Sequence, residues 1–297
     1  MPMRDSRTLV AWRPFFDVAL CYGLISLSIF LSDTFPWFYP VSVLIIANRI
    51  LALSLICHEG LHGNLFRNTK LNNFWGRWLC AFPTFISYSK YRKLHLLHHR
   101  MLGTVNKDPD LHLYQDFPLR GAAFFGKLFR DVLTFRIMKL FVEYYTEYPE
   151  LKRHRGDVLG FLKMNWRNGD IIPFTVFHIT FLISVLFMGN GKEYLFYYLI
   201  PVLLITQPYV ILMGGLQHGP LPSSEMIELK SRSIRGPKWL MEILLPLDIN
   251  FHAEHHLDPA VPHYNLKRFS KELEERGQAL WKTSYSTALR QLFSAPE

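Results

Sequence analysis

The chain has 297 residues, of which 49% are hydrophobic and 15% are aromatic. Only 19% are charged, against about 25% in an ordinary soluble domain, which excludes a disordered chain, a coiled coil and a collagen-like repeat. The formal net charge of +9 suits an acidic partner, either a membrane surface or a nucleic acid.

Four apolar blocks follow one another along the chain, at residues 15–31, 37–57, 171–188 and 194–216. Their only charged residues are Asp17 and Arg49. Each block has about 17 to 23 residues, the length that an α-helix needs to cross a bilayer. A buried core helix is the alternative for any one block, but four in one short chain favour membrane spans. We therefore predict an all-α integral membrane protein with four transmembrane helices and no nucleic-acid partner.

Lysine and arginine predict the orientation of these spans. They concentrate before the first block, in residues 58–170 and in residues 217–297, whereas residues 32–36 contain none and residues 189–193 contain only Lys192. By the positive-inside rule, both termini and a helical cap made by residues 58–170 and 217–297 face the cytoplasm. We expect a single domain, with the first block retained as a span because no A-x-A-like cleavage site follows it.

Two further segments of the cap have recognisable patterns. Residues 74–88 are apolar but are broken by Arg77 and Pro83, which favours an interfacial or re-entrant stretch over a fifth span. Residues 266–292 combine helical spacing with mixed charges and are predicted to form a cytoplasmic helix.

Histidines cluster in three boxes. The boxes are His58-Glu-Gly-Leu-His62, His95-Leu-Leu-His98-His99 and His252-Ala-Glu-His255-His256. Residues at i, i+3 and i+4 share one face of a helix, so each box can aim two or three imidazoles at a common point. Imidazole suits iron, copper, zinc and nickel, and eight histidines are too many for one tetrahedral zinc. The number fits two metals.

The predicted topology places all three boxes on the cytoplasmic side. His218 follows the fourth block by two residues and should reach the same level, so we predict that it is a further metal ligand. Gly214, Gly215 and Gly219 would let its backbone approach the site closely. The alternative is a polar residue at the membrane interface. The isolated histidines are interpreted as satisfied polar residues: His112, His154, His178 and His263.

The stretches HEGLHGNLF, YRKLHLLHHRMLGTVNKDPD and NFHAEHHLDPAVPHYNL resemble the membrane fatty acid desaturase superfamily, which includes carotenoid hydroxylases and ketolases. The resemblance implies a helical membrane fold whose cytoplasmic cap holds two irons, with the eight box histidines and His218 as ligands. It also implies that dioxygen and two external electrons remove hydrogen from an unactivated C–H bond of a lipid or another long apolar substrate. No His-Pro-Gly-Gly haem motif is present, so a separate donor, a ferredoxin or a cytochrome b5, is expected.

Metal-bound imidazoles need hydrogen-bond acceptors on their outer nitrogens. The candidate acceptors are carboxylates near the boxes: Glu59, Asp108, Asp110, Glu254 and Asp258. Surface solvation or helix capping is the alternative for each. Arg49 lies inside a predicted span, where charge is costly, and is expected to pair with a carboxylate or a polar head group.

The sequence thus predicts a di-iron, dioxygen-dependent oxidoreductase that introduces a double bond into a lipid acyl chain. A carotenoid or lipid hydroxylase or ketolase with the same centre is the first alternative. The second is a membrane zinc peptidase, because His58-Glu59-x-x-His62 also fits the HExxH pattern. A lipid-binding membrane protein without activity is the third, and it would not need the boxes.

Overall fold

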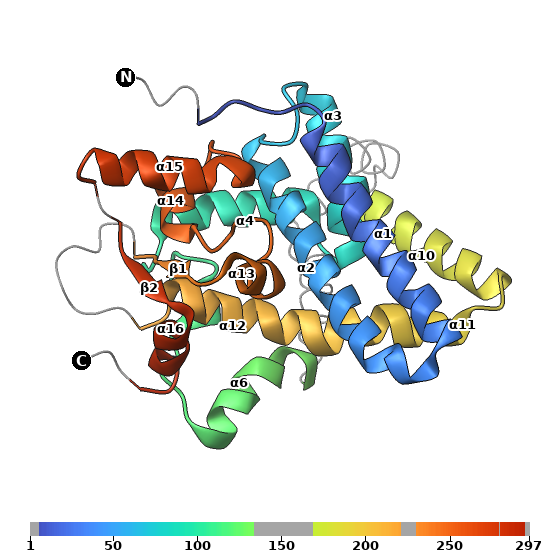
Figure 1. Cartoon of the computed structure of the whole chain (residues 1–297). Coiled ribbons are helices and arrows are strands. Elements are labelled where there is room, and N and C mark those ends of the chain that lie inside the picture. The colour runs from blue at the N-terminus through green and yellow to red at the C-terminus, as the bar shows by residue number, and fades with distance from the viewer. Residues whose placement is uncertain (1–5, 134–168, 221–229, 279, 295–297) are drawn as a thin grey trace, which may run out of the picture.

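The computed structural model describes residues 6–133, 169–220, 230–278 and 280–294. His154 and part of the predicted cap therefore lie outside the described residues. Within them the fold is mostly helical, with helical hairpins at one end and a compact cap at the other (Figure 1).

The first hairpin joins α1 (Arg13–Thr34) to α2 (Tyr39–His62) through a single 3₁₀ turn, Pro36–Phe38. A proline stands in the first turn of each long helix, where its missing N–H breaks no helical hydrogen bond. Gly63 ends α2 in the left-handed conformation with φ of 81°, which favours glycine. Gly63 therefore fixes the C-terminal end of α2 at His62.

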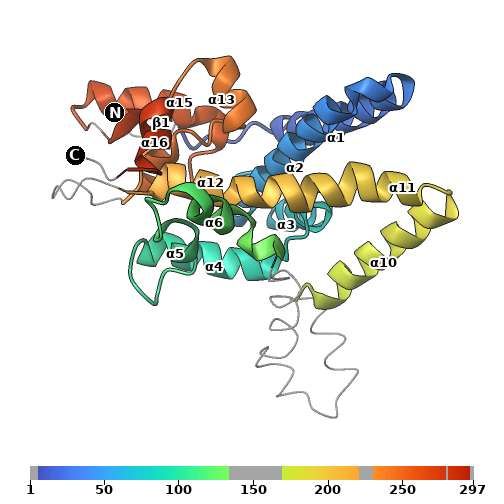
Figure 2. The same ribbon diagram turned by 90° about the horizontal axis from the view of Figure 1, so that it is seen from below.

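The second hairpin joins α10 (Ile171–Phe187) to a long, irregular helix (Figure 2). This helix begins as α11 (Gly191–Tyr194), continues through two π-helical stretches, Leu195–Leu199 and Pro201–Thr206, and ends as α12 (Gln207–His218). Its last residue is the histidine that the sequence singled out beyond the three boxes.

Three helical segments are long and apolar enough to cross a membrane: Arg13–Thr34, Pro36–His62 and Gly191–His218. These correspond to three of the four predicted spans. The remaining block, 171–188, forms a helix of 17 residues. Its length is about 25 Å, somewhat less than the roughly 30 Å of a hydrocarbon core.

Between the hairpins, the chain packs tightly along α2. It forms α3 (Thr69–Phe74), a π-helical turn (Trp75–Ala81), a 3₁₀ turn (Phe82–Thr84) and α4 (Tyr88–Met101). Cys80, Ala81 and Phe82 are fully buried, and a Cβ on Gly76 would lie 2.5 Å from the Tyr88 ring. This is the segment predicted to be interfacial or re-entrant, and it supports the helix that carries the first box.

In the residues that the structure describes, the cap is helical apart from one small sheet. Its helices are α5 (Leu111–Tyr114), α6 (Gly121–Leu133), α13 (Lys238–Leu244), α14 (His252–Leu257), α15 (His263–Glu275) and α16 (Tyr285–Gln291). Strand β1 (Ser233–Arg235) pairs in parallel with β2 (Lys282–Ser284). The prediction of an all-α fold is therefore correct except for this sheet.

The prediction of one helix over residues 266–292 is wrong. Helix α15 ends at Glu275, and Gly277 then adopts a φ of 72°, which a continuing α-helix does not allow. The chain next forms β2, and only afterwards resumes as α16.

Helix α13 packs against the middle of α2. The Asn48 amide donates to the carbonyl of Ile243 at 2.7 Å, and the buried Arg49 guanidinium lies 3.7 Å from the Glu242 carboxylate. The charge inside the second predicted span therefore faces a carboxylate of the cap.

Candidate metal centre

Four helices meet where the hairpins join the cap, and each brings histidines to the junction. Helices α2 and α12 end there, at His62 and His218, while α4 and α14 belong to the cap. The structure brings all nine predicted residues together in two clusters.

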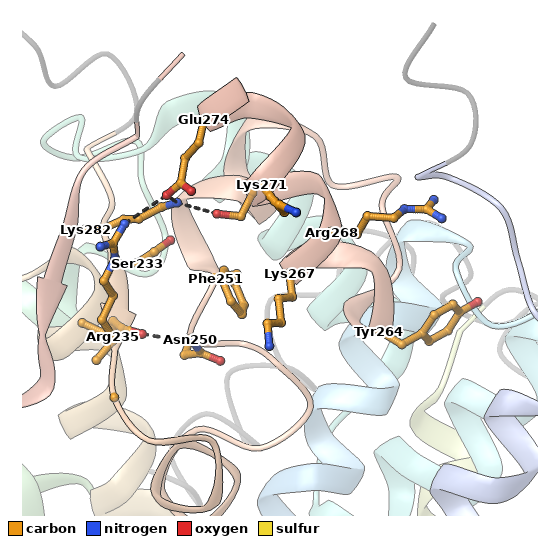
Figure 3. A pocket seen from close by; sticks show the side chains of 13 residues that line it. Ser233, Arg235, Asn250, Phe251, Tyr264, Lys267, Arg268, Lys271, Glu274 and Lys282 are labelled. Atoms are coloured by element: carbon orange, nitrogen blue, oxygen red, sulfur yellow. Dashed lines mark hydrogen bonds and ion pairs between the residues drawn. The ribbon is translucent and has the colours of Figure 1, made fainter. Parts of the chain in front are cut away.

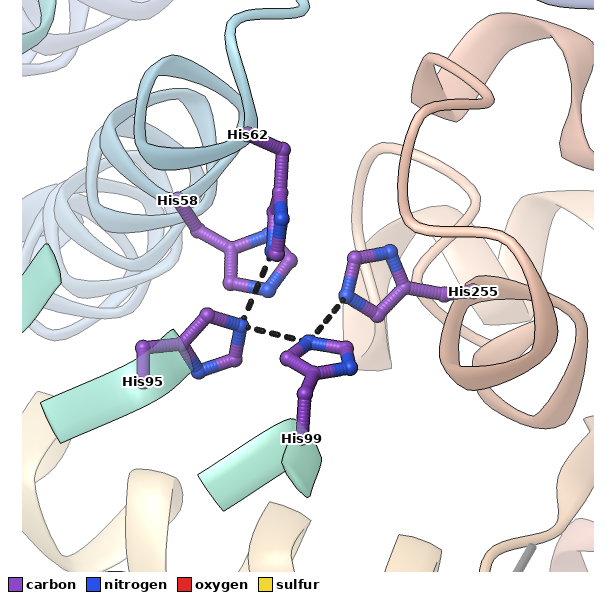
Figure 4. Close-up of side chains that lie close together, drawn as sticks. All are labelled: His58, His62, His95, His99 and His255. Carbon is purple, nitrogen blue, oxygen red and sulfur yellow. Dashed lines mark hydrogen bonds between the residues drawn. The ribbon is translucent and has the colours of Figure 1, made fainter. Parts of the chain in front are cut away.

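The first cluster contains His58, His62, His95, His99 and His255 (Figure 4). One nitrogen from each ring lies within 4.8 Å of the others. The Nε2 atoms of His62 and His95 are 3.0 Å apart, those of His95 and His99 are 2.9 Å apart, and those of His99 and His255 are 3.2 Å apart. The five rings thus converge on one point.

The second cluster contains His98, His218 and His256, whose ligand nitrogens also lie within 4.8 Å of one another, together with His252. The Nε2 atom of His252 is 2.7 Å from that of His218 and 3.1 Å from that of His256. All four side chains are buried or half-buried.

Helices α4 and α14 divide their histidines between the clusters in opposite ways. His95 and His99, four residues apart, point into the first cluster, whereas His98 points into the second. On α14, His252 and His256 point into the second cluster, whereas His255 points into the first. Because residues at i+3 and i+4 lie on opposite sides of residue i around the helix axis, one short box can serve two neighbouring points.

The nitrogen spacing fits metal ions at both points. Imidazole–metal bonds are about 2.0–2.1 Å long, so two nitrogens at right angles around one ion are roughly 3 Å apart. The observed separations between neighbouring Nε2 atoms run from 2.7 to 3.2 Å. An all-imidazole set suits iron, copper, zinc or nickel.

The protonation states suit metal binding as well. Burial lowers the pKa of His95, His252, His255 and His256 well below the usual value, and neighbouring histidines lower it further. Burial, together with His58, lowers the pKa of His99 to about 3. These rings are therefore neutral at physiological pH, the form that coordinates metals.

Asp108 holds the ring of His98, a member of the second cluster, in place. Its Oδ1 atom lies 2.8 Å from Nδ1 of His98, leaving Nε2 of that ring to face the second cluster. The carboxylate also accepts the backbone N–H of Gly103 at 2.8 Å and the Tyr114 hydroxyl. Burial alone would raise the pKa of Asp108, but the hydrogen bonds from His98, Tyr114 and Gly103 hold it below its usual value.

Two other predicted carboxylates lie near outer ring nitrogens but beyond hydrogen-bond distance. The Oε1 atom of Glu59 is 3.8 Å from Nδ1 of His58, and its Oε2 atom accepts the backbone N–H of His263 at 2.9 Å. Asp110 is also 3.8 Å from its nearest ring nitrogen, Nδ1 of His98.

The last two predicted carboxylates bind other partners. Glu254 accepts hydrogen bonds from Ser233 and Ser270, the latter at 2.6 Å, and lies 3.3 Å from the Lys282 ammonium. Asp258 pairs with Arg7 at 2.8 Å. The structure thus places Glu254 and Asp258 as anchors for the two ends of α14, and not as acceptors for imidazole.

The environment of His218 could not be read from its sequence neighbours. Its Nδ1 atom lies 3.2 Å from the carbonyl oxygen of Lys230, across a segment outside the described residues. Tyr114, which sequence reasoning missed, packs on it with ring centroids 5.0 Å apart. Gly214 and Gly215 leave room for the side chains of Leu113 and Phe117. These glycines therefore let the cap pack closely against α12.

The remaining histidines within the described residues stand apart from the clusters. His112 lies 2.9 Å from the carbonyl of Pro109, and His263 lies 3.1 Å from the carboxylate of Asp17, as expected of satisfied polar residues. His178 differs, because its ring nitrogens make no hydrogen bond with the described residues. Its ring instead stacks on Phe85, with centroids 4.4 Å apart.

Comparison with known proteins gives consistent results. The family model for fatty acid desaturases matches residues 34–285. The chain is 26% identical to the dihydrorhizobitoxine desaturase of Bradyrhizobium elkanii, over 82% of this chain and 70% of that protein. It is 25% identical to the sn-1 oleoyl-lipid 12-desaturase of Picosynechococcus sp., over 95% and 82%. It is 29% identical to the sn-1 acyl-lipid omega-3 desaturase (ferredoxin) of Synechocystis sp., over 40% and 32%.

Proposed function

The chain belongs to the fatty acid desaturase family, and from this premise we propose that it introduces a double bond into a lipid acyl chain at a di-iron centre. The observation that carries the proposal is the pair of histidine clusters. Nine imidazoles from four helices converge on two neighbouring points, an arrangement that structural packing alone does not require.

We assign His58, His62, His95, His99 and His255 to one iron, and His98, His218, His252 and His256 to the other. The irons would supply the activation of dioxygen, which protein side chains cannot perform. In the overall reaction, a –CH₂–CH₂– unit, dioxygen, two electrons and two protons give a –CH=CH– unit and two molecules of water.

The protein would supply position and a dry environment. Asp108 would orient His98 and make it a better ligand by accepting a hydrogen bond from its Nδ1–H group. The buried rings of His95, His98 and His255 indicate that bulk water has little access to the space between the clusters.

We also propose four membrane spans: the three long apolar segments described above and, in addition, α10. The apolar side chains of α10 point outward: Ile179, Ile183 and Phe187 are 53%, 60% and 91% exposed. Such a surface is unfavourable in water but suits lipid. The distribution of lysine and arginine supports a cytoplasmic location for both termini and for the metal centre.

The electrons would come from a separate carrier protein, either a ferredoxin or a cytochrome b5. The name of the Synechocystis relative gives ferredoxin as its donor. This supports a ferredoxin for the present chain.

The zinc peptidase alternative needs Glu59 as a general base beside a metal-bound water. In the structure its carboxylate instead accepts the backbone N–H of His263 and the Asn64 amide, and three further imidazoles, those of His95, His99 and His255, share the cluster with His58 and His62. No observation favours this activity over desaturation.

Expression in a host with a simple lipid profile tests the proposal. We expect mass spectrometry of the lipids to show acyl chains lighter by two hydrogens, located by fragmentation at one position. His255→Ala should abolish the product, whereas His112→Ala, outside both clusters, should not. Acyl chains heavier by one oxygen would indicate a hydroxylase instead, and an unchanged profile with correctly inserted enzyme would contradict both activities.

A further inference from the structure

A hollow opens on the surface of the cap (Figure 3). It has a volume of about 810 Å³ and is bounded by β1, the turn before α14, helix α15 and strand β2. Five basic residues line it, against a single carboxylate, Glu274; they are Arg235, Lys267, Arg268, Lys271 and Lys282.

Four of the five cations of this basic hollow are exposed, whereas the Lys282 side chain is only 9% exposed. The side chains of Arg235 and Lys271 are 66% and 76% exposed. Lys267 is exposed, makes no ion pair with any described residue, and points from α15 into the hollow in Figure 3. Glu274 is already engaged by Lys282 and by Arg235, the latter at 3.0 Å. Arg268 and Lys271 also pair with Glu272 and Glu275, at 3.5 and 3.7 Å, and Lys282 lies 3.3 Å from Glu254. Five cations therefore stand beside four carboxylates, and Lys267 is the cation that an acidic partner can reach without displacing a described carboxylate.

The floor of the basic hollow is directly connected to the metal centre. Phe251 lines the hollow and is the residue bonded to His252 of the second cluster. Ser233 and Ser270, also in the wall, both donate to Glu254 on the same short helix, α14. The wall of the hollow and the second cluster are therefore both attached to α14.

We propose that the basic hollow is the docking surface for the acidic carrier protein that delivers electrons to the centre. This inference rests on the function proposed above, which requires two external electrons per double bond. A one-electron carrier would dock, give up its electron and leave oxidised, so that two such encounters complete one turnover.

The form of the surface favours a protein partner. Four of the five cations are exposed, whereas a site for a small phosphate compound would hold its donors buried and convergent. Complexes that transfer electrons are small and transient, and charge complementarity sets their association rate. An anionic lipid surface fits less well, because α15 and β2 lie at the end of the molecule away from α10 and α11 (Figure 1).

The test uses the iron-loaded enzyme in nanodiscs of zwitterionic lipid, and a labelled acidic [2Fe–2S] ferredoxin as the probe. Lys267→Glu should weaken binding at low salt, and the double variant Lys267→Glu/Lys271→Glu should weaken it by about tenfold or more. The matched control is Lys93→Glu, which makes the same charge change on exposed α4, on the other side of the cap in Figure 2. This control should bind normally.

Two results would overturn the proposal. One is an equal loss of affinity in Lys267→Glu and Lys93→Glu, since net charge alone would then explain binding. The other is a double variant that keeps its affinity for ferredoxin but loses adhesion to phosphatidylserine vesicles, which would make this face a lipid surface.

Turnover with dithionite and a viologen mediator separates this inference from the function itself. We expect the double variant to match the wild type with this small reductant and to slow only when ferredoxin is the donor. If the wild type forms no product with dithionite, the proposed desaturation fails, while the binding experiment still decides whether ferredoxin docks in the basic hollow.

Discussion

His98 has the best-defined outer hydrogen bond of the nine clustered histidines. Its Nδ1 atom faces Asp108 at 2.8 Å, and Asp108 is itself held by Gly103 and Tyr114. Partners of this kind fix both the tautomer and the orientation of a metal-bound ring. Orientation at this position therefore depends on a residue ten positions further along the chain.

Asp108→Asn should reduce metal affinity and turnover by about 10- to 100-fold, because an amide is a weaker acceptor for the His98 Nδ1 proton. Metal content after dialysis and product formation measure the two effects. Asp110→Asn is the control, because Asp110 lies 3.8 Å from the same nitrogen and should have little influence. Equal losses in both variants would contradict a specific role for Asp108.

His218→Ala should remove a ligand from the second cluster and lower iron occupancy together with turnover. The observation behind this expectation is the 2.7 Å separation between its Nε2 atom and that of His252. His178→Ala, which alters a histidine remote from both clusters, should keep its iron. Full iron and normal turnover in His218→Ala, at equal expression, would show that this residue is not a ligand.

The sequence could predict which histidines gather but not how they divide. Helical spacing placed each box on one face, and the end of an apolar block placed His218 at the same level. The offset between i+3 and i+4 lets His98 point away from His95 and His99, but the histidines that it meets come from α12 and α14, whose positions depend on the tertiary fold. Tyr114 was missed because its contact with Asp108, six residues earlier, depends on how α5 turns back toward that carboxylate.

Helix α12 delivers His218 to the centre, and a buried arginine closes its end. The guanidinium of Arg232 is fully buried and donates to the carbonyl oxygens of Gly215, Leu216 and Pro220. Burial lowers the pKa of Arg232 to about 10, which leaves the group protonated at neutral pH. Arg232 thus satisfies carbonyls at the end of α12, in addition to the hydrogen bond that the Gly219 N–H donates to the Gly215 carbonyl at 2.8 Å.

Arg232→Met should destabilise the protein by about 3 kcal/mol, since hydrogen bonds from a buried charge to several carbonyls are lost. The thermal unfolding midpoint in detergent should fall, and iron should be lost from the His218 side of the centre. Arg235→Met is the matched control: its side chain is 66% exposed, so the midpoint should change little. A midpoint equal to that of the wild type in Arg232→Met would contradict the capping role.

At the level of elements, length and hydropathy predicted the long helices well and the cap less well. The predicted helix over residues 266–292 failed at Gly277, where a positive φ redirects the chain toward β2. Strands β1 and β2 have three residues each and pair across 46 intervening positions. They are too short to show an alternating pattern and no hairpin turn joins them, so the sequence does not predict this sheet. Such short, non-local pairings depend on tertiary context.

The whole molecule combines an apolar end with a charged one. Large apolar side chains on α1 and α10 are exposed, including Phe30 at 63% and Phe187 at 91%. The clustered histidines lie where the hairpins join the cap, beside the ends of α2 and α12. In this arrangement the metal centre would lie beside the part of the molecule that faces lipid, while the cap would remain accessible to a donor protein.

Cysteine labelling tests the proposed topology. The three native cysteines are no more than 1% exposed and should not react with a membrane-impermeant maleimide. A cysteine at Val105, which is 70% exposed in the cap, should label only from the cytoplasmic side of sealed vesicles. One at the exposed Asn190, between α10 and α11, should label only from the opposite side. Labelling of both positions from the same side would contradict four spans.

The most direct test of the account is the number and identity of the metal ions bound per folded chain, measured by mass spectrometry of the purified enzyme. The two histidine clusters, in a chain of the fatty acid desaturase family, lead us to expect two irons per chain, with a loss of iron in both His62→Ala, from the first cluster, and His256→Ala, from the second. One zinc per chain, bound as tightly in His256→Ala as in the wild type, would contradict the di-iron centre and favour the HExxH alternative.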